Sequence, residues 1–226
     1  MPTAEGALAA LRAHADAGRA AQMAAYHKAD RIYLGLGNDT VEELVRPWRA
    51  DLARDEKVAL AAALWDSDIY EARIAAAKLL TQARVKPDDA PVWDEVQRWV
   101  PQFDSWAIAD AAAKPIERRL MAEPARFDDV ADWILHPNMW TRRAALVSTL
   151  YWAKGRHPDA AHLDARERVL AWAAALVPDH DWFIQKAIGW WLRTLSLTDP
   201  DRVHVFLDLH GDRLRAVARK EAVRRM

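Results

Sequence analysis

An acid and an aromatic residue one helical turn apart are the side chains most able to carry chemistry in this chain. Four segments begin with an aromatic residue, at spacings of 36, 34 and 43 residues. They read YEARIAAA, WAIADAAA, WTRRAALV and FIQKAIGW, and they start at Tyr70, Trp106, Trp140 and Phe183. The residue four places later is apolar in three segments and is Asp110 in the second. We expect the other repeats to bury this position and Asp110 to be accessible.

Trp106 and Asp110 are four residues apart, so a helix places them on one face. A substrate that touches the indole would then also meet the carboxylate. The alternative is that Asp110 is an ordinary solvated surface acid, but its place in the repeat favours a functional role.

Trp190 is a second candidate, because it stands seven residues after Phe183, where the other repeats carry Ala77, Ala113 and Val147. Adjacent helical residues point about 100° apart. We therefore expect at most one of Trp190 and Trp191 to share a face with Trp106, and the other to lie in the core.

Basic residues form a candidate DNA-binding edge. Three of the four repeats carry a basic residue three places after the aromatic, namely Arg73, Arg143 and Lys186. For Arg73 we prefer the interpretation that it lines a solvated helix face. Residues 202–226 hold seven Lys or Arg against three Asp or Glu, so they either dock DNA or cap the last repeat. The predicted DNA contacts are Arg142, Lys186, Arg193, Arg219 and Lys220.

Composition narrows the class of protein. The 226 residues carry 32 Lys or Arg against 33 Asp or Glu, so a polyanionic partner must meet a locally basic face. Cysteine is absent, which removes disulfides, thiolate nucleophiles and cysteine metal sites. Phosphate-loop, dinucleotide and zinc-protease motifs are missing, so we expect no metal and no cofactor. With no long apolar run, a soluble cytoplasmic protein without a membrane partner is expected.

Helix-forming residues and their breaks predict an all-α fold. Residues 3–28 predict one or two helices broken near Gly18, then a turn over residues 32–37, and Thr40 with Glu43 predicts a capping box. Two helices fit each period, which is typical of a HEAT-like superhelix, or solenoid, with a concave binding face. We expect one such domain over residues 1–226. Six tryptophans are predicted to be core residues: Trp48, Trp65, Trp93, Trp99, Trp133 and Trp172.

Several of these segments resemble one known family, the AlkD-type DNA alkylation-repair glycosylases. The similarity covers MAAYHKADRIYLG (23–35), LWDSDIYEARIAAAKLL (64–80), FDSWAIAD (103–110), NMWTRRAAL (138–146), FIQKAIGWWLR (183–193) and KEAVR (220–224). The resemblance implies a HEAT-like superhelix that excises cationic N3- or N7-alkylated purines without a metal. It places the catalytic aspartate on Asp110, the substrate-facing tryptophans on Trp106 and Trp190, and the active-site arginine on Arg143.

The resemblance also implies how the enzyme would meet its substrate. The family is known for contacting the backbone of double-stranded DNA at the lesion and leaving the alkylated base stacked. The flanks of Trp106 depart from the family's acidic or amide-rich pattern, because they are Ser105 and Ala107. Divergent members bind DNA without excising bases. Two alternatives therefore stand beside a monomeric glycosylase of base excision repair: an inactive DNA-structure binder and a scaffold for a protein partner.

Overall fold

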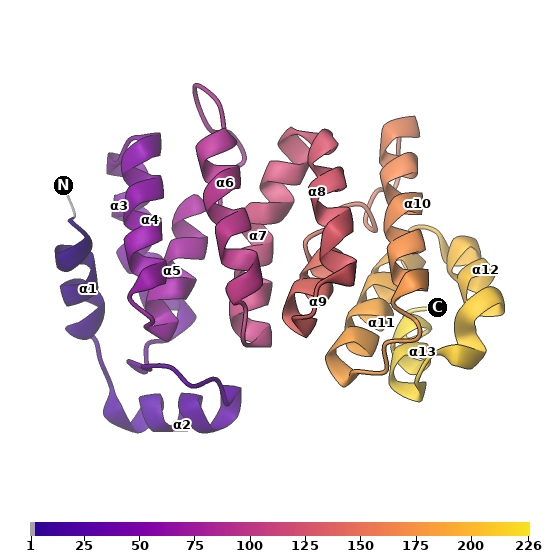
Figure 1. Cartoon of the computed structure of the whole chain (residues 1–226), viewed down its shortest axis with the longest axis horizontal. Helices are drawn as coiled ribbons and strands as arrows, with labels where there is room; N and C mark the ends of the chain where they lie inside the picture. Colours follow the sequence, from indigo (N-terminus) through magenta and orange to yellow (C-terminus); the bar gives the residue numbers. More distant parts are fainter. Residues whose placement is uncertain (1–2) are drawn as a thin grey trace. The chain divides into compact units, whose positions relative to one another are not determined.

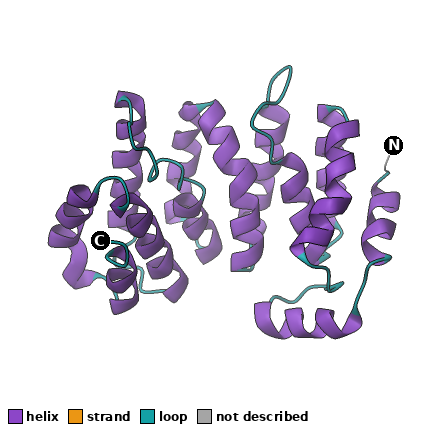
Figure 2. Cartoon of the chain, turned by 180° about the vertical axis from the view of Figure 1, so that it is seen from behind, coloured by secondary structure: helices purple, strands orange, loops and turns teal. Residues whose placement is uncertain are grey.

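Helices make up the architecture of this chain. The computed structural model describes residues 3–226, which form helices joined by short connections, with no strand among them (Figure 1). Figure 2 shows the same helices and loops from the opposite side. The only strand-like feature of the described residues is an isolated bridge between Ile32 and Ile69. The predicted all-α class is confirmed. Within residues 3–226 no helix is both long and apolar enough to cross a membrane.

The chain divides into two compact units, Met1–Ala122 and Glu123–Met226. In unit 1, α5 packs against α3, α4 and α7, while α2 lies across the ends of the helices beside it (Figure 1). The helices of unit 1 are α1 (Ala4–Arg12), α2 (Ala17–His27), α3 (Asn38–Asp51), α4 (Arg54–Asp66), α5 (Tyr70–Leu80), α6 (Ala90–Trp99) and α7 (Trp106–Ala122).

Unit 2 is organised around α11, which packs against α9, α12 and α13. Its helices are α8 (Phe127–Ala131), α9 (Met139–Val147), α10 (Ala160–Ala175), α11 (Trp182–Ser196), α12 (Pro200–His210) and α13 (Ala216–Ala222). Helices α5, α7, α9 and α11 are thus each preceded by a partner helix or helical turn, as the two-helix period predicts.

The four aromatic-led segments mark helix starts. Tyr70 and Trp106 are the first residues of α5 and α7, and Trp140 and Phe183 are the second residues of α9 and α11. In the last two cases a side chain caps the helix, because Asn138 accepts a hydrogen bond from the Trp140 amide and Asp181 accepts one from the Phe183 amide. The repeat in the sequence therefore marks the first turn of the second helix in each helix pair.

Two predicted helix boundaries are wrong. The first break lies at residues 13–16 rather than near Gly18, because Asp16 caps α2 by accepting from the Arg19 amide at 3.0 Å. Thr40 does not cap a helix, since α3 already begins at Asn38 after an extended Gly37. The predicted turn over residues 32–37 is confirmed as the connection between α2 and α3.

Tryptophan fills much of the core, as predicted. All six predicted core tryptophans are buried, and Trp65 and Trp99 stack with parallel rings whose centroids are 4.4 Å apart. Such offset aromatic packing adds to the free energy gained by burying the rings. Because these side chains are buried inside their units, they are packing residues with no access to a ligand.

The backbones of α11 and α13 approach closely at Gly189. A Cβ atom added there would lie 2.8 Å from Cβ of Glu221 and 2.9 Å from the carbonyl oxygen of Ala218. Only glycine fits such a contact without a shift of one helix. Helix α13, which carries Arg219 and Lys220, is therefore packed directly on the backbone of α11.

Candidate active site

Trp106 and Asp110 occupy the first two turns of α7, and both are partly exposed. The equivalent residues of the other repeats are buried, with exposed fractions of 6% for Ile74, 1% for Ala144 and 2% for Ala187. This confirms that the repeat register separates Asp110 from the core. A carboxylate in this position remains accessible instead of being forced into the apolar interior.

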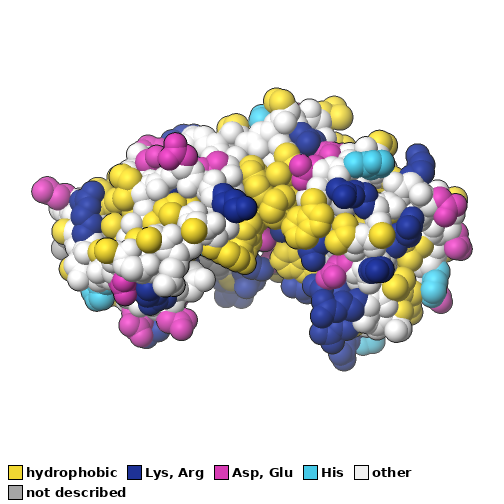
Figure 3. Space-filling view, turned by 90° about the horizontal axis from the view of Figure 1, so that it is seen from below, with side chains coloured by type: hydrophobic (Ala, Val, Ile, Leu, Met, Phe, Trp, Pro, Cys, Tyr) yellow, Lys and Arg dark blue, Asp and Glu magenta, His cyan; other side chains and the backbone are white. Residues whose placement is uncertain are grey.

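Both side chains line an open cavity of about 880 Å³ within unit 1. Helices α2, α3, α5 and α7 all contribute to its wall. Seen from the side on which α2 lies in Figure 1, hydrophobic side chains reach the surface among lysine and arginine side chains (Figure 3). A cavity in which an indole and a carboxylate stand beside cations suits a ligand that is itself polar and charged.

An aromatic cluster surrounds the indole of Trp106. The ring of His27 lies 5.4 Å from it and the ring of Tyr26 lies 6.0 Å from it, in an edge-to-face arrangement. His27 also stacks on Tyr70 at 4.7 Å, and Tyr33 stacks on the other side of the cluster against Tyr70 at 4.9 Å. These contacts fix the orientation of the indole on α7. Among these partners only Tyr70 belongs to the aromatic repeat, and the other three lie in the segment 23–35 that carries the family resemblance.

Burial favours the neutral forms of two members of the cluster, His27 and Tyr70. Burial lowers the pKa of His27, and the nearby Glu71 carboxylate opposes that shift without cancelling it. Burial raises the pKa of the Tyr70 hydroxyl, which lies 3.1 Å from Nε2 of His27. At neutral pH the wall beside Trp106 is therefore aromatic and uncharged.

Glu71 is a buried carboxylate that organises the connection between α2 and α3. It is 1% exposed and accepts hydrogen bonds from the amides of Leu34, Gly35 and Leu36, at 2.9, 2.7 and 3.2 Å. Gly35 adopts a φ of 87°, and a Cβ there would lie 2.3 Å from the Asp16 carbonyl oxygen. Both features hold α2 against α5, and α2 supplies the aromatic side chains that contact Trp106.

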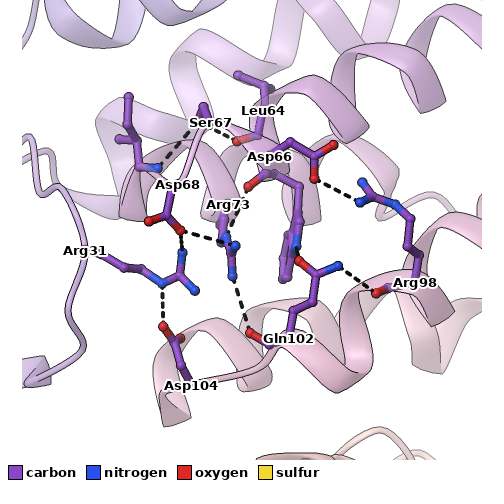
Figure 4. A network of polar contacts seen from close by, with 11 residues as sticks. Arg31, Leu64, Asp66, Ser67, Asp68, Arg73, Arg98, Gln102 and Asp104 are labelled. Atoms are coloured by element: carbon purple, nitrogen blue, oxygen red, sulfur yellow. Dashed lines mark hydrogen bonds and ion pairs between the residues drawn. The ribbon is translucent and has the colours of Figure 1, made fainter.

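A buried ion network positions the starts of α5 and α7 (Figure 4). Arg31 pairs with Asp68, two residues before α5, and its Nε lies 2.6 Å from a carboxylate oxygen of Asp104, two residues before Trp106. The side chain of Arg31 is only 6% exposed, whereas both partners reach solvent. One guanidinium thereby joins the α2–α3 connection to the first turns of both helices.

Arg73 does not line a solvated helix face, contrary to the sequence-based interpretation. Its residue is 6% exposed, and its guanidinium lies 4.5 Å above the Trp65 ring while donating to the Trp65 carbonyl at 3.1 Å. It also pairs with Asp68 at 3.3 Å (Figure 4). Burial lowers the pKa of Arg73 to about 10. Arg73 is therefore a structural residue and is unavailable to a phosphate backbone.

The candidates from the second half of the chain lie in unit 2. Trp191 is fully buried and its indole nitrogen donates to the Thr149 carbonyl, whereas Trp190 is partly exposed. This confirms that one of the two adjacent tryptophans belongs to the core. Arg143 on α9 is 5% exposed and donates to the Phe183 carbonyl at 3.0 Å. It therefore links α9 to the first turn of α11.

Four of the predicted DNA contacts already have partners within unit 2. Arg142 pairs with Asp179 at 2.8 Å and donates to the carbonyls of His136 and Pro137. Arg193 pairs with Glu221, while Arg219 donates to the carbonyls of Gly211 and Leu214. Lys186 lies 5.5 Å from the ring of Trp182.

Lys220 and Arg219 are exposed on α13, so both can reach a partner in solution. Lys186 and Arg193 are partly exposed on α11. These side chains keep some access to an anion despite their contacts. Whether they touch DNA remains a prediction from the sequence.

Metal-ligating side chains form no cluster in the described part of the chain. Among residues 3–226 no group of three or more histidine, aspartate or glutamate side chains is arranged to hold a metal ion. The chemistry available at the cavity is that of the accessible Asp110 carboxylate, the ion-paired Glu42 carboxylate, an aromatic wall and nearby cations.

Comparison with known proteins adds the family context. A family model described as DNA alkylation repair enzyme matches residues 7–226. A predicted DNA alkylation repair enzyme from Enterococcus faecalis superposes with a TM-score of 0.74 at 22% identity, over 94% of this chain and 97% of that one. AlkD2 from Streptococcus mutans superposes with a TM-score of 0.64 at 18% identity, over 84% and 91% of the two chains. No curated protein matches the sequence. At these identities the solved structures establish the fold.

Proposed function

Because the chain belongs to the family of DNA alkylation repair enzymes, we propose that it is a DNA glycosylase which excises positively charged N3- or N7-alkylated purines from duplex DNA. A role in DNA alkylation repair follows from the family, and the bond and the substrate are our proposal. The observation that carries it is the accessible Asp110 carboxylate beside Trp106 in the cavity of unit 1. We further propose that the protein acts as a cytoplasmic monomer without a cofactor.

Asp110 would act by stabilising charge on the sugar. An N3- or N7-alkylated purine is already cationic, so the bond from C1′ to the base nitrogen can break without a general acid. The bonding electrons leave with the base, which becomes neutral, and the deoxyribose becomes oxocarbenium-like. A carboxylate beside the sugar stabilises this transition state more than the ground state. Water would then add to C1′ and release a proton to the Asp110 carboxylate.

One carboxylate can supply a large part of such a rate enhancement. Two unit charges about 4 Å apart interact by roughly 4 kcal/mol at an effective dielectric constant near 20. An energy of that size corresponds to about a thousandfold in rate. Removal of the charge at Asp110 should therefore reduce excision by about that factor.

Trp106 would pack against the sugar and add to the stabilisation of its positive charge. An indole face attracts a cation through its electron-rich ring. Its contacts with His27 and Tyr26 hold the ring in place before the substrate arrives, and a preorganised group loses less freedom on binding. Because the histidine pKa is lowered, the cluster brings no competing cation to the sugar at neutral pH.

Trp190 and Arg143 belong to unit 2, and we propose their roles from the family resemblance. Trp190 would contact the substrate sugar. Arg143, which is 5% exposed and donates to the Phe183 carbonyl, would have to turn outward to hold a neighbouring phosphate. We also propose that the alkylated base stays stacked while the backbone is contacted. It follows that bulky cationic adducts should be accepted and uncharged lesions should be poor substrates.

The decisive experiment compares Asp110→Asn with Asp94→Asn. Asp94 is an exposed aspartate of α6 outside the cavity, so its variant loses the same charge from the same unit. We expect Asp110→Asn to fold normally and to lose about a thousandfold in single-turnover excision of 7-methylguanine from duplex DNA. Asp94→Asn should retain the native rate. Unchanged excision by Asp110→Asn would remove the carboxylate from the mechanism, and a native chain that binds duplex DNA without releasing a base would be an inactive binder.

A further inference from the structure

Lys114 continues the cavity-facing stripe of α7 that begins with Trp106 and Asp110. The three residues follow one another at intervals of four, so they lie on the same face of the helix. All three line the cavity, together with the small side chains of Ala107 and Ala111. Lys114 is exposed, so its ammonium group can reach a ligand bound in front of α7.

The cations that line this cavity differ in how far their charge is compensated. Arg49 and Lys78 both pair with Glu42, at 3.0 and 3.1 Å. Arg19 on α2 and Lys114 on α7 form no ion pair with any residue from 3 to 226. The positive charge still available to a ligand in the cavity is therefore that of Arg19 and Lys114.

A carboxylate that stabilises a sugar must also face the phosphates attached to that sugar. The approach of Asp110 to DNA is opposed by repulsion from these phosphates, and a cation nearby offsets it. Four residues of an α-helix span about 6 Å along its axis. This distance is comparable to the separation between a sugar carbon and its neighbouring phosphate, which are a few covalent bonds apart.

We propose that Lys114 binds the backbone phosphate next to the sugar that Asp110 stabilises, with Arg19 contributing from α2. This inference rests on the proposed function, and it assigns a phosphate-binding role that the sequence pattern did not indicate. The ammonium group donates to a non-bridging phosphate oxygen as a compact point charge. Its contribution is electrostatic and exposed to solvent, so it falls as salt rises.

Salt dependence of binding tests the contact directly. Each phosphate contact contributes about −0.9 to the slope of log K against log salt for duplex DNA. We expect Lys114→Gln to make that slope shallower by about 0.9 on undamaged duplex DNA, measured by fluorescence anisotropy. Between roughly 50 and 200 mM salt, native affinity should then fall about 3.5-fold further than the variant's affinity. Lys114→Arg keeps the charge and should restore the native slope.

Arg46→Gln is the matched control, because Arg46 is an exposed cation of α3 that does not line the cavity. It removes the same charge from the same unit and should leave the slope unchanged. A second comparison uses the Asp110→Asn background. If the cation offsets repulsion between the carboxylate and the phosphate, the two changes are coupled, and Lys114→Gln should weaken binding by a different factor there.

The outcomes separate this inference from the proposed function, because binding and excision are measured independently. An unchanged slope for Lys114→Gln, or an equal change for Arg46→Gln, overturns the role of Lys114 even where 7-methylguanine is excised at the native rate. A shallower slope for Lys114→Gln alone supports the role, even in a chain that excises nothing. Absence of duplex binding at low salt overturns it as well.

Discussion

His27 is the titratable side chain that packs both on Trp106 and on Tyr70. One nitrogen of the half-buried ring meets the Tyr70 hydroxyl, and the ring also contacts Trp106. Protonation would place a charge where burial already lowers the pKa of His27. It should therefore weaken the packing of this ring beside Trp106.

Acidification should destabilise the protein through His27. Its pKa in the folded chain lies below the ordinary value of 6.5, so the unfolded chain binds a proton first as pH falls. The stability from this group is complete above pH 6.5 and is lost as pH falls through the lowered pKa. We expect urea unfolding midpoints at pH 7.5 and 5.5 to differ less in His27→Gln than in the native protein.

His204→Gln serves as the control for that experiment, because His204 is exposed on α12. It should show the same pH dependence as the native chain. Equal losses of stability on acidification in native protein and His27→Gln would show that burial of this histidine has no thermodynamic consequence.

At the scale of elements, α7 depends on contacts made before its first residue. Arg31 forms an ion pair with Asp104, which lies two residues before Trp106. It also forms one with Asp68, which lies two residues before α5 (Figure 4). A single side chain from the α2–α3 connection therefore sets the start of the helix that carries Asp110. Displacement of that start would move the indole and the carboxylate together.

Arg31→Met should lower both stability and excision. The substitution removes a buried cation and leaves two carboxylates that can still be solvated, so we expect a loss of about 1–2 kcal/mol in the free energy of unfolding. Single-turnover excision should fall because near-attack geometry tolerates little displacement. Urea unfolding and 7-methylguanine release measure the two effects.

Arg54→Met is the matched control, since Arg54 forms ion pairs with Asp55 and Asp88 at the surface. Exposed pairs contribute little, so this variant should keep nearly native stability and native excision. Equal behaviour of the two variants would show that the Arg31 network does not position α7.

The same elements show how far sequence reasoning reaches. The four helix starts follow from the aromatic repeat, because each aromatic is the first or second residue of its helix. The same register predicts that Ile74, Ala144 and Ala187 are buried and that the equivalent residue Asp110 is accessible. Thr40 was wrongly predicted as a cap, because an extended glycine two residues upstream of Asp39 starts the helix earlier.

What could not be predicted involves partners distant in the sequence. Arg31 meets Asp104 across 73 positions (104 minus 31), and no local pattern marks either residue as a partner of the other. Arg73 was expected in solvent because its repeat position matches that of other cations, yet the Trp65 ring and two backbone carbonyls enclose it. Pairings of this kind depend on tertiary packing, which repeat spacing does not encode.

At the scale of the molecule, the chain consists of two compact units, 1–122 and 123–226. The repeat spacing predicts one continuous array in which each helix pair buries its apolar stripe against its neighbours. Adjacent repeats in such arrays are coupled through their interfaces. The number of cooperative unfolding steps therefore distinguishes one array from two independent domains.

We expect the whole chain to unfold in a single calorimetric transition. Trp65→Ala opens a cavity in the core of unit 1, and Gly189→Val forces α11 and α13 apart in unit 2. Each should lower the midpoint of that one transition, the first by an amount that corresponds to about 3–5 kcal/mol. Two transitions, with each variant shifting only one of them, would contradict the single-domain prediction.

The close approach at Gly189 affects how the basic residues of α13 can bind an anion. Because α13 rests on the backbone of α11, Arg219 and Lys220 sit on a rigid support, unlike the cations of a flexible tail. Such groups surrender little conformational entropy when they meet an anion. Their affinity for a polyanion should therefore persist on warming. An unstructured basic arm would lose affinity, because the entropic cost of ordering it on binding grows with temperature.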